Sequence, residues 1–250
     1  MFITKDIMRA MRFKLSALFL LIVSAVAAQD IHVKVDTTQQ IPTIGPNRRF
    51  YLDYNIGAGF ITGPEQRGAA INWWSSSLSY SIRGKLKLWS WDALVGDISY
   101  RYDRYSIDQK QPKRLPIDPL VHQRERISVS NLSFSLCNRI SLGKHGNVLG
   151  RYIDAGVYAD WAFRATNVYL DQYYDSNSPA GRARIKSKLS RLNYIEPLNY
   201  GIVVRAGSNN TALFGMWRMN ELIKNSVDRN YPDLPQLIIG IQVSGLISGH

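Results

Sequence analysis

The segment from Ile153 to Ala165, IDAGVYADWAFRA, constrains the fold more than any other part of this sequence. Its apolar residues occupy every second position: Ile153, Ala155, Val157, Ala159, Trp161, Phe163 and Ala165. Side chains of a β-strand point alternately to opposite faces, so this segment predicts a strand with one apolar and one charged face. With its neighbours it extends from about Arg151 to Asp171, longer than the ~9–11 residues that cross a bilayer. An apolar outside and a charged inside are typical of a barrel in lipid, and a strand of a soluble sandwich is the alternative.

Seven further segments show the same alternation: Phe50–Ile61, Ser75–Trp89, Asp92–Ile107, Arg124–Leu142, Tyr194–Ala206, Thr211–Leu222 and Gln236–Ile247. Short connections (Trp89–Asp92, Gly143–Gly150, Gly207–Asn210) alternate with long ones (Thr62–Trp74, Asp108–Gln123, Gln172–Asn193, Ile223–Pro235). The sequence therefore predicts an all-β fold, an eight-stranded antiparallel up-and-down transmembrane β-barrel with short periplasmic turns and long extracellular loops. A phase slip near Ser130 and Asn131 predicts a β-bulge.

The N-terminus has the pattern of a secretory signal. Basic residues Arg9, Arg12 and Lys14 precede an apolar stretch, Leu15–Val26, and small residues follow up to Ala28. We expect a signal peptide over residues 1–28, a periplasmic lead-in over 29–49 and the barrel over 50–250. Export and a barrel together predict the outer membrane of a Gram-negative bacterium.

The strand faces opposite the apolar ones carry many charges. The predicted interior contains Asp53, Arg83, Asp97, Arg101, Arg139, Asp154, Asp160, Arg164, Arg205 and Arg218, together with Lys85 and Asp103. An eight-stranded barrel is just wide enough for its own side chains, and an unpaired buried ion is costly. These residues predict a structural network of ion pairs that plugs the lumen. A proton or solute path is the alternative.

The chain is basic, with a formal net charge of +12. Because the chain is expected to be exported, nucleic acid is not an expected partner, and outer-membrane lipid and lipopolysaccharide phosphates are. The segment RARIKSKLSR places Arg182, Arg184, Lys186 and Lys188 at alternate positions in the third long loop. These four residues predict an anion-binding loop, to which Lys110–Arg114 adds charge, and a merely solvated loop is the alternative.

Residues for catalysis or metal binding are scarce. The four histidines are not placed beside a serine on a strand, and there is a single cysteine, Cys137. His122, with Ser128 further along the chain, is the best candidate for a lipid-modifying site. No HExxH motif, paired cysteines or phosphate-binding glycine loop occurs. We therefore expect no catalytic residues, no metal and no cofactor, and a protein that is not an enzyme.

The signal, the opening FYLDYNIGAGF, the hairpin pattern and the amphipathic last strand resemble a known group of proteins. They are similar to the small outer-membrane β-barrels of Bacteroidota, the PorT-like group, and more distantly to OmpA/OmpX-type barrels. The resemblance covers about Phe50–Ile247, but the chain ends on Leu246–His250 without the aromatic residue common in such barrels. It implies a structural or interaction role through the extracellular loops, or a part in a protein-secretion apparatus, and supplies no site residues. Other envelope or secretion proteins are then possible partners.

Overall fold

The computed structural model describes residues 49–63, 69–109, 122–142, 150–174, 182–224 and 232–245. These ranges contain nine β-strands: β1 Phe50–Thr62, β2 Ser76–Lys87, β3 Asp92–Ile107, β4 Arg124–Leu142, β5 Arg151–Tyr174, β6 Arg182–Ser190, β7 Leu198–Ser208, β8 Thr211–Arg218 and β9 Leu237–Ser244. The expected signal peptide, nearly all of the lead-in and Lys110–Arg114 lie outside the described residues. Within those ranges, no helix has the length and apolar character needed to span a membrane.

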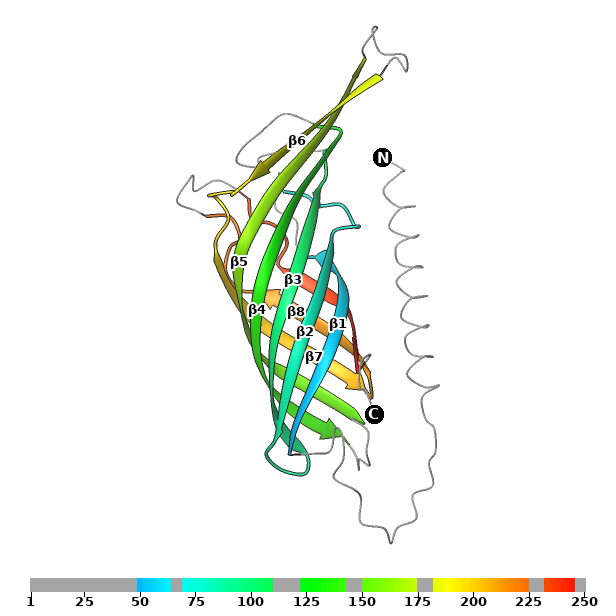
Figure 1. The fold of residues 1–250 in the computed structure, drawn as a ribbon, viewed down its shortest axis with the longest axis vertical. Helices are drawn as coiled ribbons and strands as arrows, with labels where there is room; N and C mark the ends of the chain where they lie inside the picture. The colour runs from blue at the N-terminus through cyan, green and yellow to red at the C-terminus, as the bar shows by residue number, and fades with distance from the viewer. Residues whose placement is uncertain are drawn as a thin grey trace. The chain divides into compact units, whose positions relative to one another are not determined.

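Eight of the strands close into a ring. Hydrogen bonding follows the order β4-β3-β2-β1-β9-β8-β7-β5-β6, and β4 also pairs with β5 (Figure 1). All pairings are antiparallel, so the predicted eight-stranded up-and-down barrel is confirmed. The ninth strand, β6, lies outside the ring, and among the described strands it pairs with β5 alone. The long connection expected over Gln172–Asn193 therefore contains the end of β5 and all of β6, so its basic segment is a strand.

The outward face of the ring is apolar. Ile56, Ile98, Val157 and Ile202 are each about half exposed, at 50%, 55%, 59% and 47%. Between them along each strand lie buried polar and charged side chains, so the interior is more polar than the exterior. A soluble sandwich or barrel has the opposite arrangement. The exposed apolar band identifies a transmembrane barrel of the outer-membrane type.

A β-bulge interrupts the pairing of β4 with β5 at the predicted position. Ser130 pairs with Arg164 and Asn131 with Ala162, so Phe163 is the additional residue on β5. The bulge shifts the alternation by one residue, and Arg164 is exposed instead of facing the lumen. The prediction that Arg164 belongs to the lumen network is therefore wrong, because a strict two-residue period does not persist through a bulge.

Beyond the bulge, β3 to β6 continue as a four-stranded sheet that leaves the ring (Figure 1). One edge of β5 pairs with β7 up to Trp161 and with β6 from Thr166 onward. The inner face of this sheet contributes Tyr105, Ile107, Ile127 and Val129 to a buried apolar cluster. The other members lie between strands: Leu192 and Ile195 after β6, Leu222 and Ile223 after β8, and Leu234 before β9. The isolated bridges Ile71–Ile107 and Ile195–Ile223 join these segments. An apolar core thus covers the inner side of the extension, whereas its outer side faces away.

Candidate functional site

The first group of charges lies inside the ring and is centred on Asp97. Its carboxylate accepts from Arg83 Nε at 2.5 Å and from Arg205 Nη2 at 2.7 Å. Ser135 Oγ donates to the same carboxylate at 2.8 Å, and Arg83 Nη2 donates to Gln242 Oε1 at 2.9 Å. One carboxylate is thus shared by two buried guanidinium groups from different strands.

Arg139 and Asp154 form a second buried pair. Arg139 Nε and Nη2 donate to the two carboxylate oxygens of Asp154 at 2.7 and 2.8 Å. The guanidinium carbon also lies 3.8 Å from the ring centroid of Tyr152. Two parallel hydrogen bonds and a stacked aromatic ring fix this arginine in a single orientation.

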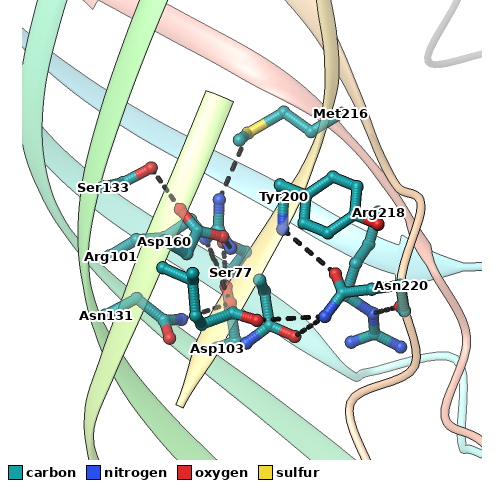
Figure 2. A network of polar contacts seen from close by, with 12 residues as sticks. Ser77, Arg101, Asp103, Asn131, Ser133, Asp160, Tyr200, Met216, Arg218 and Asn220 are labelled. Atoms are coloured by element: carbon teal, nitrogen blue, oxygen red, sulfur yellow. Dashed lines mark hydrogen bonds and ion pairs between the residues drawn. The ribbon is translucent and has the colours of Figure 1, made fainter. Parts of the chain in front are cut away.

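A third group surrounds Arg101 (Figure 2). Arg101 Nε donates to Asp103 at 3.0 Å, and its Nη2 forms an ion pair with Asp160. Ser77 Oγ and Asn131 Nδ2 donate to the two oxygens of Asp103 at 2.6 and 2.9 Å. The remaining acceptor sites of Asp103 are therefore filled by neutral donors, as a buried carboxylate requires.

Arg218 is paired through a residue that the sequence reasoning missed. Its Nη2 donates to Asp233 Oδ2 at 2.9 Å and to the carbonyl oxygen of Leu234 at 2.8 Å. Asp233 also accepts from the backbone N–H of Leu222 at 2.9 Å. Because Asp233 lies in a segment predicted as loop, no strand alternation indicated that it would be buried. Asp53, a predicted member, is buried and accepts from the N–H of Tyr54 at 2.8 Å.

The structure thus places nine of the ten predicted lumen residues inside the ring, all except Arg164. Each of the five lumen arginines has a carboxylate partner. Charges matched in this way stabilise the barrel only when each remains paired. In the described part of the chain, no group of three or more histidine, cysteine or carboxylate side chains is arranged to hold a metal ion.

A different arrangement of charge lies on the outer side of the β3–β6 extension. In an antiparallel pair, residues directly opposite one another have their side chains on the same face. Arg126 is opposite Val168, which is opposite Lys188. Arg124, Leu170 and Lys186 form the next row. We call the outward cations of this sheet the basic face: Arg104, Arg124, Arg126, Arg164, Arg184, Lys186 and Lys188.

The cations of the basic face lack acidic partners. None of them has an ion-pair partner among the described residues, although Arg184 lies against the amide of Gln172. The outward positions of β3–β6 beyond the bulge contain no carboxylate in the described sequence. The Nε atom of Arg104 is buried without a hydrogen-bond partner. The basic face therefore presents donors that the protein itself does not satisfy.

An apolar strip on β5 separates the cations of β4 from those of β6. Val168 and Leu170 on β5 are half-buried and separate Arg124 and Arg126 on β4 from Lys186 and Lys188 on β6. Neighbouring strands lie ~4.8 Å apart, so the cations of β4 and those of β6 are about 10 Å apart. A ligand with anionic groups at the edges and a less polar middle fits this arrangement.

The structure gives partial information on the predicted anion-binding loop. Arg184, Lys186 and Lys188 are exposed on β6, and Arg182 occupies the next same-face position of that strand, its side chain lying outside the described residues. Sequence reasoning missed the contribution of Arg104, Arg124, Arg126 and Arg164. The alternation along β3 and β4 indicated outward positions for Arg104, Arg124 and Arg126, but only the register of four strands brings them together with Arg164.

The predicted His122 site is not assembled for nucleophilic catalysis. His122 Nδ1 lies 2.9 and 3.0 Å from the two carboxylate oxygens of Asp171, and its ring centroid is 4.6 Å from that of Tyr169. Ser128 is buried on β4, six residues or about 20 Å further along an extended chain at ~3.3 Å per residue. His122 therefore ties the start of β4 to β5 instead of activating Ser128.

Polar contacts on the inner side of the extension hold neighbouring strands together. Buried Glu125 accepts from Asn167 Nδ2 at 3.0 Å and from Gln109 Nε2 at 3.2 Å. The same amide of Asn167 donates to Tyr169 Oη at 2.9 Å. Burial raises the pKa of Tyr194 above its ordinary value. These contacts stabilise the sheet whose outer side carries the basic face.

Comparisons with known proteins carry little information about this chain. No protein-family model matches the chain, and no curated protein matches it. Among solved structures, the chain is similar to Ail, the attachment invasion locus protein of Yersinia pestis, in a crystal structure with the heparin analogue sucrose octasulfate. The identity is 8%, the TM-score is 0.32, and the match covers 78% of this chain and 97% of that one. A likeness at this level does not establish a common family or function.

Proposed function

We propose that this protein is a closed outer-membrane barrel that acts as a binding protein at the cell surface, not as a pore or an enzyme. The contact region is the β3–β6 extension with its loops. The observation that supports this most strongly is the contrast in charge between the lumen and the basic face. Lumen arginines are buried against carboxylates, whereas none of the basic-face cations has an acidic partner among the described residues.

The packing of the lumen argues against transport. Buried guanidinium and carboxylate groups from several strands meet across the interior, as in the Arg101–Asp160 and Arg205–Asp97 contacts. The apolar cluster that includes Leu192, Ile223 and Leu234 adds a second layer at the end of the ring from which the extension leaves. A solute would have to break both layers, and an eight-stranded barrel has no spare width.

Conductance across a planar lipid bilayer tests the closed state. The purified, refolded protein should insert without reproducible current steps. Asp97→Ala, which frees two lumen arginines, serves as a comparison because it disturbs the network without altering the basic face. Stable ohmic steps from the parent protein would contradict a closed barrel and favour a solute path.

Cysteine labelling on intact cells tests the orientation that the binding role requires. Ser187→Cys on exposed β6 should react with a membrane-impermeant maleimide. Asn209→Cys, in the turn between β7 and β8, should react only after the cells are opened. Native Cys137 is buried and serves as an internal negative control. The reverse labelling pattern would place the extension in the periplasm and overturn a cell-surface role.

A part in a protein-secretion apparatus is the alternative that the sequence resemblance to the PorT-like group suggests. Co-purification of the barrel with other envelope proteins in stoichiometric amounts would favour it. Isolation of a clean single species after mild detergent extraction would weaken it.

A further inference from the structure

We propose that the basic face binds the phosphate groups of a phosphorylated glycolipid in the outer leaflet that surrounds the barrel. This inference rests on the proposed surface-binding role and names its ligand. The residues that carry it are Arg104, Arg124, Arg126, Arg164, Lys186 and Lys188.

The basic face has the charge that an anionic ligand requires. These six cations come from four strands and share one side of one sheet, with no carboxylate at the outward positions that the structure describes. Like charges held this close repel one another, so an anionic ligand gains from several of them at once. Guanidinium groups suit phosphate because their donors form a fixed fork. Lysines on a free edge strand prevent pairing with other chains, which would account for the lysines of β6. It does not account for the arginines of β3, β4 and β5.

The basic face is continuous with the lipid-facing surface of the barrel. Trp161 and Phe163 are 55% and 49% exposed, and Phe163 lies 6.2 Å from the Tyr100 ring, centroid to centroid. Exposed aromatic rings mark the level of the membrane interface. Arg164 follows directly on β5, opposite Ser130. The cations therefore begin where the aromatic surface ends, which favours a ligand anchored in the same membrane over a soluble one.

The basic face is longer than the headgroup zone of a phospholipid leaflet is thick. From Arg164 to the row of Arg124 and Leu170 the β5 strand advances six residues, about 20 Å at ~3.3 Å per residue. The headgroup zone of an ordinary phospholipid leaflet is only about 5–8 Å thick. A simple phospholipid reaches only the lowest cations. A glycolipid with phosphates on successive sugars matches the whole face, and the apolar Val168–Leu170 strip can lie under the sugar rings.

The experiment measures Kd of the full-length refolded protein in detergent micelles. Three probes are compared: lipopolysaccharide with phosphorylated lipid A and inner core, the same lipopolysaccharide after enzymatic dephosphorylation, and a soluble sulfated oligosaccharide. The test variant carries Arg124→Gln, Arg126→Gln, Lys186→Gln and Lys188→Gln. The matched control carries Arg49→Gln, Lys87→Gln, Arg151→Gln and Lys224→Gln, which remove equal charge away from the basic face. Heat-modifiable gel mobility verifies that each variant is folded.

We expect the test variant to lose about tenfold in affinity for the phosphorylated lipopolysaccharide at low salt, since several cations act together. The control should lose less than about twofold, because its four cations are not grouped on one face and single surface charges contribute little. The difference should shrink at about 0.5 M salt through screening. Dephosphorylated lipopolysaccharide should bind the parent and the test variant alike.

Two results would overturn the proposal. Unchanged affinity of the test variant for phosphorylated lipopolysaccharide would mean that the basic face is only solvated. Loss of binding to the sulfated oligosaccharide alone would assign the face to a soluble polyanion. If the quadruple variant fails to fold, the double variant Lys186→Gln with Lys188→Gln replaces it in the same binding measurement. This double variant keeps all arginines of the ring strands. Neither result bears on conductance or cysteine labelling, so failure here is distinguishable from failure of the proposed function.

Discussion

Arginine plays two different roles on the two sides of the same sheet. Inside the ring, each arginine contacts a carboxylate, and Asp97 serves two of them. Outside the ring, Arg124, Arg126 and Arg164 have no ion-pair partner in the described structure. Net charge alone therefore does not locate a binding site. What distinguishes a candidate site is charge that the fold itself leaves unmatched.

The comparison predicts its largest effect at Asp97. Asp97→Ala leaves Arg83 and Arg205 buried without their shared partner, which should lower the free energy of unfolding by about 3–5 kcal/mol. Urea titration of the refolded protein in lipid vesicles measures this. The control is Asp171→Ala, whose side chain is 43% exposed and should cost at most about 1 kcal/mol. Similar losses for both variants would erase the proposed distinction between inside and outside.

The second prediction compares two isoleucines of similar exposure. Ile202→Arg on the lipid-facing side of β7 should lower stability by ~2–4 kcal/mol, the cost of a cation near the bilayer midplane. Ile185→Arg on β6 should change it by less than about 1 kcal/mol, because an exposed charge outside lipid is well solvated. Ile202 and Ile185 are 47% and 50% exposed, so burial within the protein does not distinguish them. Equal costs measured in the same vesicles would mean that β6 also lies in the membrane.

The smallest effect is expected on the basic face itself. Arg126→Gln combined with Lys188→Gln should alter the free energy of unfolding by less than about 1 kcal/mol, since neither residue has an ion pair to lose. Urea titration at low salt measures this, and relief of like-charge repulsion can even give a slight gain. A loss of 2 kcal/mol or more, about that of a broken buried contact, would show that these cations support the fold.

Much of the ring could be predicted from the sequence because lipid imposes a strict two-residue period on each strand. The bounds predicted for β3 and β4, Asp92–Ile107 and Arg124–Leu142, agree with the structure. The bulge position was also visible as a phase slip at Ser130 and Asn131. The sequence did not show that the additional residue lies on β5, where it turns Arg164 outward.

The rest of the site depended on information that a single strand does not contain. The short β6 strand alternates cations with Ile185 and Leu189, but its position beside β5 is set by pairing beyond the ring. Asp233 reaches Arg218 from a segment without regular alternation. The basic face requires the register of β3, β4, β5 and β6 together, and register between distant strands is not readable from composition.

Chemical modification of arginine tests whether the lumen arginines are shielded and the basic-face arginines are accessible. The folded protein in micelles is treated with phenylglyoxal, and the extent of reaction at each arginine is measured by mass spectrometry. Exposed Arg124, Arg164 and Arg184 should react at rates near those of the urea-unfolded chain, whereas lumen Arg83, Arg101, Arg139, Arg205 and Arg218 should remain unmodified until unfolding. Reaction of the lumen arginines at the same rate as the exposed ones would contradict the account of a closed barrel with unmatched charge only on its outer side.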